Sequence, residues 1–147
     1  MKICVVCHGN ICRSPMAELL FKKMLKESGE LSQHTVVSRA THLDEIGNGV
    51  YYMAKPIYDR LDIDYSNHRA TLLTKSDYEK YDLFIGMDNA NLYNMQRLFN
   101  GDKENKVKLL LSFAGENREV ADPWYTRDFN KTYSDIMLGL KALYKTL

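Results

Sequence analysis

Cysteine and proline are both rare in this sequence of 147 residues, which contains three of each. The three cysteines all fall within the first twelve residues, so they cannot form a disulfide framework that spans the chain. We therefore expect a reducing, cytoplasmic location, where a cysteine is catalytic, redox-active or simply packed in the core.

Long apolar runs and a strong charge of either sign are also absent. Only five apolar residues follow Met1 and Lys2, too few for the core of a signal peptide, and no run reaches the length of a membrane span. The 20 basic and 19 acidic side chains leave a net charge of +1. We expect no nucleic-acid or membrane partner, and any anion site must be local.

The apolar periodicity alternates between strands and helices. Strands are predicted at residues 2–7, 34–40, 82–87 and 106–113. Helices are predicted from Ser14 and Pro15 to Gly29, at about 56–61, from 74, from about 89 to 99 and at 133–147. The length fits a single domain, residues 1–147. The alternation predicts a doubly wound α/β fold of three αβα layers, in which helices cover both faces of a four-stranded parallel sheet.

The stretch VCHGNICRSP, residues 6–15, connects the first predicted strand to the first helix. A tight loop there turns backbone N–H groups inward and forms an anion nest at the positive end of the helix. Gly9 and Asn10 tolerate the unusual backbone angles that such a loop needs. Arg13 adds a planar fork that suits two phosphate oxygens. The spacing therefore predicts a phosphate site.

Cys7 would lie at the floor of this positive bowl, where its thiol ionises readily to a nucleophilic thiolate. The alternative interpretation makes all three cysteines small core residues and Arg13 a surface residue. For Cys4, inside the strand, we adopt the core interpretation.

The stretch VCHGNICRSPMAE resembles the phosphate-binding loop of the low-molecular-weight protein tyrosine phosphatases, whose pattern is roughly V-C-x-G-N-x-C-R-S-P-x-A-E. The similarity continues thinly along the chain, through Ser38, Thr41, Gly47, His68, MDNAN at 87–91 and DPWY at 122–125. The resemblance implies a flavodoxin-like, phosphotyrosine phosphatase I-like fold. It also implies hydrolysis of phosphotyrosine monoesters through a cysteinyl-phosphate, with no cofactor and no metal.

The resemblance assigns catalytic roles to three residues. Cys7 is the nucleophile, Arg13 binds the phosphate and stabilises its equatorial oxygens, and Asp122 is the general acid and then the general base. Pro123 restrains the backbone of Asp122. The phosphate is bound by the loop that comprises His8, Gly9, Asn10, Ile11, Cys12 and Arg13.

Further residues are expected to support the loop. Ser14 would cap the helix and donate a hydrogen bond to the thiolate, and Asn10 would hold the loop in shape from within. His68 would support Ser14 and Asn10 from behind, unless it is an exposed surface residue. Asp88 would support the loop, act as the N-cap of the following helix, or do both.

Trp124 and Tyr125 are the expected walls of the substrate slot, deep enough to leave phosphoserine short of the thiolate. Cys12 would trap an oxidised Cys7 as a reversible disulfide, or it is a small buried filler. Both interpretations of Cys12 stay open.

The sequence departs from the family pattern around the rim of the site. Asp44 stands at the substrate wall where an aromatic residue is usual, and His8 where the residue is usually small or apolar. Ala40 and Thr71 replace a usual glycine and arginine. We expect a weaker grip on the phosphotyrosine ring, and a substrate affinity that His8 makes more dependent on pH.

Three other functions compete with tyrosine phosphatase activity. Arsenate reduction needs further cysteines downstream, and none follows Cys12. A protein-arginine phosphatase would carry threonine in place of Ile11, whose bulk favours an aromatic ester. A phosphopeptide-binding module would lack Cys7 or Asp122.

The partners expected from the resemblance are a phosphotyrosine-containing protein, for which a tyrosine kinase is one candidate, and anions such as phosphate, sulfate or vanadate. The chain is expected to be mainly monomeric, and a weak dimer through Trp124 and Tyr125 is the alternative.

Overall fold

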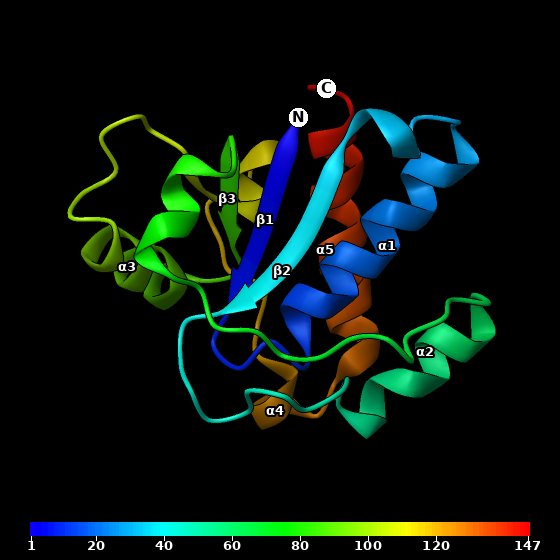
Figure 1. The fold of residues 1–147 in the computed structure, drawn as a ribbon. Coiled ribbons are helices and arrows are strands. Elements are labelled where there is room, and N and C mark those ends of the chain that lie inside the picture. The colour runs from blue at the N-terminus through cyan, green and yellow to red at the C-terminus, as the bar shows by residue number, and fades with distance from the viewer.

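Four parallel strands form the sheet at the centre of the computed structural model, which describes residues 1–147 (Figure 1). The strands are β1 (Lys2–Cys7), β2 (Thr35–Ala40), β3 (Leu83–Gly86) and β4 (Val107–Leu109). Their order across the sheet is β2-β1-β3-β4. The chain therefore winds outward from β1 in both directions, and the loops after β1 and β3 meet at the carboxyl edge, where ligands bind in such sheets.

Helices cover both faces of this sheet. They are α1 (Arg13–Glu27), α2 (Lys55–Arg60), α3 (Asn89–Leu98), α4 (Pro123–Thr126) and α5 (Phe129–Tyr144). α1 and α5 pack against one another on one face, and α3 contacts β3 and β4 on the other (Figure 1). The predicted three-layer αβα fold is confirmed. No helix combines the length and apolarity needed to cross a bilayer.

The core is divided by the sheet into two clusters, and β1 contributes to both. Ile3, Val5 and Cys7 belong to the larger cluster with α1 and α5, whereas Cys4 and Val6 belong to the smaller one. Successive side chains of a strand point to opposite faces, which explains this alternation. Cys4 is fully buried, so its predicted core role is confirmed.

The predicted fourth strand is too long. β4 ends at Leu109, and residues 110–114 form a 3₁₀ helix. Leu110 and Leu111 are completely buried beside α5, and a helical turn buries these apolar side chains as well as a strand would. Gly115, at φ 74°, ends the turn in a left-handed conformation. By contrast, the helix predicted from residue 74 is present as a 3₁₀ helix at Lys75–Glu79, with Thr74 and Asp77 forming its capping box.

Candidate active site

The loop between β1 and α1 is shaped by Asn10, as predicted. Asn10 is fully buried and adopts a left-handed φ of 60°, whereas Gly9 does not have a positive φ. The side-chain Oδ1 of Asn10 accepts a hydrogen bond from the backbone N–H of Thr71 at 2.9 Å. Because a backbone N–H can only donate, this contact fixes the amide orientation and directs Nδ2 toward two hydroxyls. Those are Ser14 Oγ at 2.8 Å and Ser38 Oγ at 2.9 Å.

This orientation determines where the Ser14 hydroxyl hydrogen points. Ser14 Oγ accepts from Asn10, so its own hydrogen is available to Cys7 Sγ, 3.0 Å away. The backbone N–H of Ser14 also donates to the same sulfur at 3.4 Å. Two donors on a buried sulfur stabilise a thiolate more than a thiol.

Ser14 is not the N-cap of α1, so this part of its predicted role is wrong. The helix begins at Arg13 and Ser14 is its second residue, while the N-cap position, Cys12, offers no capping side chain. The physical reason is that the Ser14 hydroxyl is engaged by Cys7 and Asn10. The Ser14 hydroxyl therefore serves the sulfur and the loop instead of capping the helix.

His68 lies behind the loop, half-buried, and its Nε2 donates to the backbone oxygen of Asn10 at 2.7 Å. The predicted support of Asn10 is confirmed, but His68 makes no hydrogen bond to Ser14. Ser38 Oγ instead donates to Glu18 at 2.6 Å and extends the network behind the loop. Glu18 was missed, although it is the last residue of the VCHGNICRSPMAE stretch.

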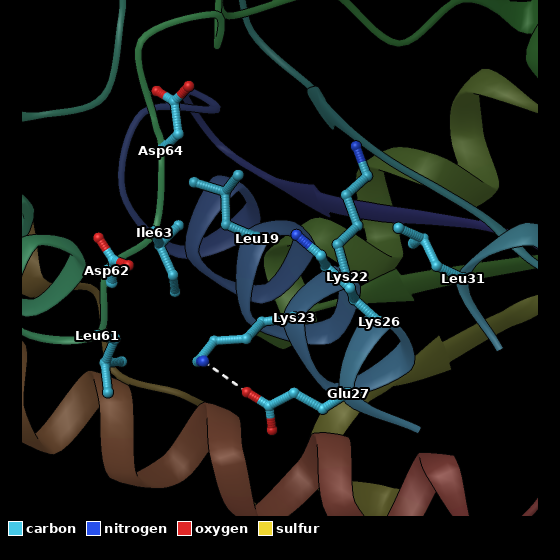
Figure 2. Close-up of a pocket in the computed structure, with 10 residues that line it drawn as sticks. All are labelled: Leu19, Lys22, Lys23, Lys26, Glu27, Leu31, Leu61, Asp62, Ile63 and Asp64. Atoms are coloured by element: carbon cyan, nitrogen blue, oxygen red, sulfur yellow. Dashed lines mark hydrogen bonds and ion pairs between the residues drawn. The ribbon is translucent and has the colours of Figure 1, made fainter. Parts of the chain in front are cut away.

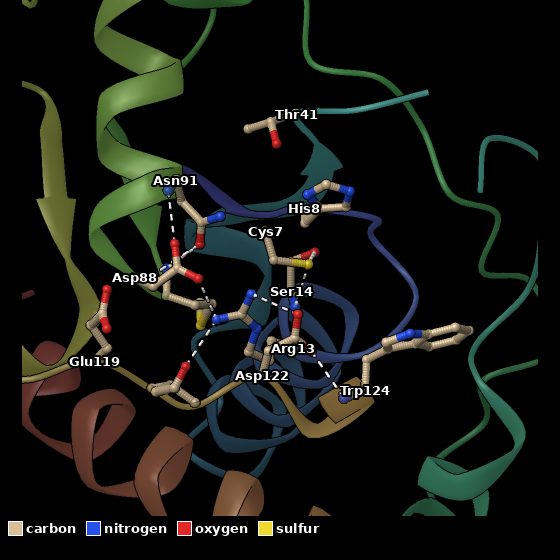
Figure 3. Close-up of polar contacts among 12 residues, drawn as sticks. Cys7, His8, Arg13, Ser14, Thr41, Asp88, Asn91, Glu119, Asp122 and Trp124 are labelled. Atoms are coloured by element: carbon tan, nitrogen blue, oxygen red, sulfur yellow. Dashed lines mark hydrogen bonds and ion pairs between the residues drawn. The ribbon is translucent and has the colours of Figure 1, made fainter. Parts of the chain in front are cut away.

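Arg13 is only 2% exposed, and its guanidinium is held in place from the next loops (Figure 3). Its Nη1 donates to Asp88 at 2.8 Å and to the backbone oxygen of Val120 at 2.9 Å, and Nη2 lies 3.5 Å from Asp122. Burial opposes the charge, but Cys7, Asp122 and Asp88 outweigh it and raise the pKa of Arg13. The guanidinium is therefore a fixed cation beside the sulfur.

Asp88 has both of its predicted roles. Its Oδ1 accepts the backbone N–H of Asn91 at 2.8 Å and caps α3, while its Oδ2 accepts from Arg13. In the other direction, the side-chain Oδ1 of Asn91 accepts hydrogen bonds from the backbone N–H groups of Met87 and Asp88. The N-terminus of α3 thereby fixes the direction of the Arg13 fork.

Asp122 lies across the site from Cys7 and is the N-cap of α4, with an extended backbone before Pro123. Its Oδ1 accepts the backbone N–H of Trp124 at 3.0 Å. The preceding segment is attached to the end of β3, since the N–H of Val120 donates to Met87 at 2.9 Å and Glu119 accepts the N–H of Asn89 at 2.8 Å. The carboxylate is thus positioned by the loop and not by α4 alone.

A cleft of about 160 Å³ opens above the loop, and nine residues line it: His8, Gly9, Ile11, Cys12, Asp44, Glu45, Asp122, Trp124 and Tyr125. Trp124 is 40% exposed and its ring packs on Tyr51, with centroids 4.9 Å apart. Tyr125 is 80% exposed. Tyr51, which supports the Trp124 wall, was missed because it lies in an irregular segment.

Cys12 is a buried free thiol at the floor of this cleft, and burial raises its pKa. No disulfide joins it to Cys7. The packing role is visible here, and the redox role stays a prediction.

The rim contains the two unusual residues of the sequence. Asp44 Oδ2 lies 2.8 Å from His8 Nε2, and the hydrogen bond from His8 lowers the pKa of Asp44. The His8 ring also stacks on His42, with centroids 3.9 Å apart. Asp44 therefore lines the cleft, as expected, and also forms a hydrogen bond with His8, a contact that sequence spacing did not indicate.

The sequence profile of a family described as "Low molecular weight phosphotyrosine protein phosphatase" matches residues 2–147. The human protein of the same name is 36% identical over 142 residues, which cover 93% of this chain and 89% of that protein.

The chain belongs to this family.

Solved structures agree with the low-molecular-weight phosphatase assignment. The enzyme SP-PTP of Streptococcus pyogenes superposes with a TM-score of 0.88 at 33% identity, covering 99% of this chain and 92% of that one. Vibrio vulnificus Wzb in complex with benzylphosphonate superposes with a TM-score of 0.86 at 28% identity, covering 99% and 98%.

The phosphatase site is not the largest hollow of the molecule. A groove of about 560 Å³ lies against the outer side of α1, between its lysines and residues 61–64 (Figure 2). It contains no cysteine, histidine or residue of the β1–α1 loop. No group of three histidine, cysteine or acidic side chains is arranged to hold a metal ion.

Proposed function

We propose that this low-molecular-weight phosphatase hydrolyses phosphotyrosine monoesters in proteins, with Cys7 as nucleophile, Arg13 as phosphate ligand and Asp122 as general acid and base. The observation that carries the proposal is the arrangement of Arg13, Ser14 and the α1 N-terminus around one buried sulfur. The same positive groups stabilise the Cys7 thiolate and bind a dianionic phosphate ester next to it.

In the first step, the Cys7 sulfur attacks phosphorus and the bond from phosphorus to the tyrosyl oxygen breaks. Asp122 gives its proton to that oxygen, because a phenolate leaves poorly unless it is protonated. The N–H groups of the loop and the Arg13 fork carry the charge of the equatorial oxygens. Arg13 needs no reorientation for this work, since Asp88 and Val120 already hold Nη1.

In the second step, a water attacks the phosphorus of the cysteinyl-phosphate and Asp122 takes its proton. The phosphorus–sulfur bond breaks and Cys7 leaves as a thiolate. The Ser14 hydroxyl, 3.0 Å from the sulfur, stabilises this leaving group.

Aromatic esters are favoured by the shape of the cleft. Trp124 offers a flat, half-exposed face held by Tyr51, and Ile11 adds apolar bulk at the floor. The relative Wzb was crystallised with benzylphosphonate, an aromatic ligand of the same kind. A guanidinium-bound phosphate is the second candidate, because Glu45 at the rim would attract its positive charge.

The proposed partners follow from this chemistry: a phosphotyrosine-containing protein such as a tyrosine kinase, and phosphate, sulfate or vanadate as competing anions. We also propose a cytoplasmic setting, where Cys7 stays reduced. We propose a monomer as the working form, because an interface over Trp124 and Tyr125 would cover the cleft.

The test compares phosphate release from a phosphotyrosine peptide, a phosphoarginine peptide and a phosphoserine peptide. The parent should release phosphate from the first, and Cys7→Ser should release none while still binding vanadate, which shows that the loop is folded. Turnover that survives in Cys7→Ser, or a preference for phosphoarginine, would contradict the proposal.

A further inference from the structure

A third hollow, of about 550 Å³, lies beside the catalytic cleft. It is bounded by the loop that follows β2, by residues 72–73 and by the side of α3 that bears Asn94 and Arg97. We call it the flanking groove, and the residues that define it here are His42, Leu43, Leu72, Asn94, Arg97 and Leu98.

The flanking groove and the catalytic cleft share a wall. The N–H of Thr41 donates to the backbone oxygen of Cys7 at 3.0 Å, and the N–H of His42 donates to that of His8 at 3.1 Å. The stacked rings of His8 and His42 continue this wall, with His8 on the cleft side and His42 on the groove side. The groove is thus within reach of residues a few positions away from a phosphotyrosine that occupies the cleft.

Half of the residues that line the groove are leucines, and Arg97 gives it a positive charge. Leu43 is 71% exposed, and Leu72 and Leu98 are half-buried next to it, so three leucines offer apolar surface to a ligand. Arg97 is exposed and takes part in no ion pair; its guanidinium lies 5.8 Å from the ring of Tyr93.

No carboxylate lines the groove, and the nearest one in the sequence, Asp44, is engaged by His8 at the cleft. The ligand that complements these groups presents an aliphatic side chain together with a carboxylate.

We propose that the flanking groove binds the part of a phosphoprotein substrate next to its phosphotyrosine, with an aliphatic residue against Leu43, Leu72 and Leu98 and an acidic residue at Arg97. This inference rests on the proposed function, because it assigns a substrate class to the same site. It makes the enzyme selective among phosphotyrosine sequences without altering the chemistry at Cys7.

The test uses three substrates and three variants. The substrates are p-nitrophenyl phosphate and two phosphotyrosine peptides, one with Leu and Glu within three residues on both sides and one with Ser and Lys there. The variants are Leu43→Ser, Arg97→Glu and the control Lys26→Glu. Lys26 lies in the groove on α1 (Figure 2), so the control makes the same charge change away from the flanking groove.

The parent and Lys26→Glu should favour the acidic–aliphatic peptide at least about fivefold in kcat/KM, mainly through KM, since these contacts are made equally in the ground and transition states. Arg97→Glu should remove or reverse this preference and Leu43→Ser should reduce it. Each variant should keep kcat/KM on p-nitrophenyl phosphate within about twofold of the parent.

Equal use of both peptides by the parent would overturn the inference, while turnover of both would leave the proposed function intact. An Arg97→Glu variant that behaves like Lys26→Glu would also overturn it. So would a parallel loss of activity on p-nitrophenyl phosphate, because Arg97 would then act on the structure of the cleft. A parent that hydrolyses no phosphotyrosine substrate would instead refute the proposed function itself.

Discussion

Removing the Ser14 hydroxyl should slow the release of Cys7 from its phosphorylated form. Ser14 Oγ lies 3.0 Å from Cys7 Sγ and is oriented by Asn10 Nδ2, so Ser14→Ala deletes one of two hydrogen bonds to the thiolate. A hydrogen bond to a charged group contributes about 1.5–3 kcal/mol, which corresponds to roughly tenfold to hundredfold in rate. The N–H of Ser14 remains, so the lower half of this range is expected for kcat.

The variant also leaves one Asn10 Nδ2 hydrogen without its acceptor in a buried network. Ser38 still accepts the other, and the free energy of unfolding should fall by about 1 kcal/mol. This loss does not unfold an ordinary domain, so the kinetic effect stays measurable.

The assay measures kcat for a series of aryl phosphates whose phenol leaving groups differ in pKa, with rapid mixing to detect a burst. In Ser14→Ala, hydrolysis of the cysteinyl-phosphate should limit the rate, so kcat becomes independent of the leaving group and one equivalent of phenol appears in a burst. Ser28→Ala, at the other end of α1, is the matched control. A kcat for Ser14→Ala equal to that of Ser28→Ala would refute this reasoning.

Three further results are expected. Asp122→Asn should lower kcat/KM about 10²–10⁴-fold for phosphotyrosine and less for esters with good leaving groups, and an equal loss for all esters would exclude proton donation. His8→Ala should make kcat/KM less dependent on pH than in the parent; an unchanged pH profile would rule out a contribution of His8. Asp135→Asn should lower the free energy of unfolding by about 1 kcal/mol at pH 7. Burial disfavours the charged form of Asp135, but hydrogen bonds from Arg118 and Lys131 outweigh it and lower the pKa of this carboxyl group. A carboxylate whose pKa is lowered by folding stabilises the fold at pH values above about 3.9, its pKa in the unfolded chain. This stabilisation is lost as the pH falls through the pKa of the folded state. In urea unfolding, the difference in stability between Asp135→Asn and the parent should therefore vanish in acid.

The anion loop could be predicted from the sequence because its parts are local. Cys7, Asn10 and Arg13 lie within seven consecutive residues between a strand and a helix, and their types alone indicate a left-handed turn and a phosphate ligand. The continuous apolar run of β1 likewise predicted a buried strand, and its side chains are divided between the two core clusters.

The support from His68 and Asp88 was expected only from the family resemblance, and the other supports could not be predicted, because they depend on distant loops that meet at the sheet edge. The Val120 oxygen that holds Arg13 is a backbone atom 107 residues away, with no signature in its side chain. The stacking of His42 on His8 and the hydrogen bond between Asp44 and His8 depend on the path of the loop after β2, which the sequence does not reveal. The short β4 has the same cause, because the packing of Leu110 and Leu111 beside α5 decides between a strand and a helical turn.

The reactivity of Cys7 tests the central claim most directly. Its alkylation by iodoacetate should be followed from about pH 5.5 to 8.5, with and without vanadate, and the modified residue should be located by peptide mapping. We predict fast, single-site modification of Cys7 already below pH 7, where an ordinary thiol with a pKa near 8.5 reacts slowly, and strong protection by vanadate. A rate that rises through pH 8.5 as for a free cysteine, with no protection by vanadate, would contradict a thiolate held in an anion site.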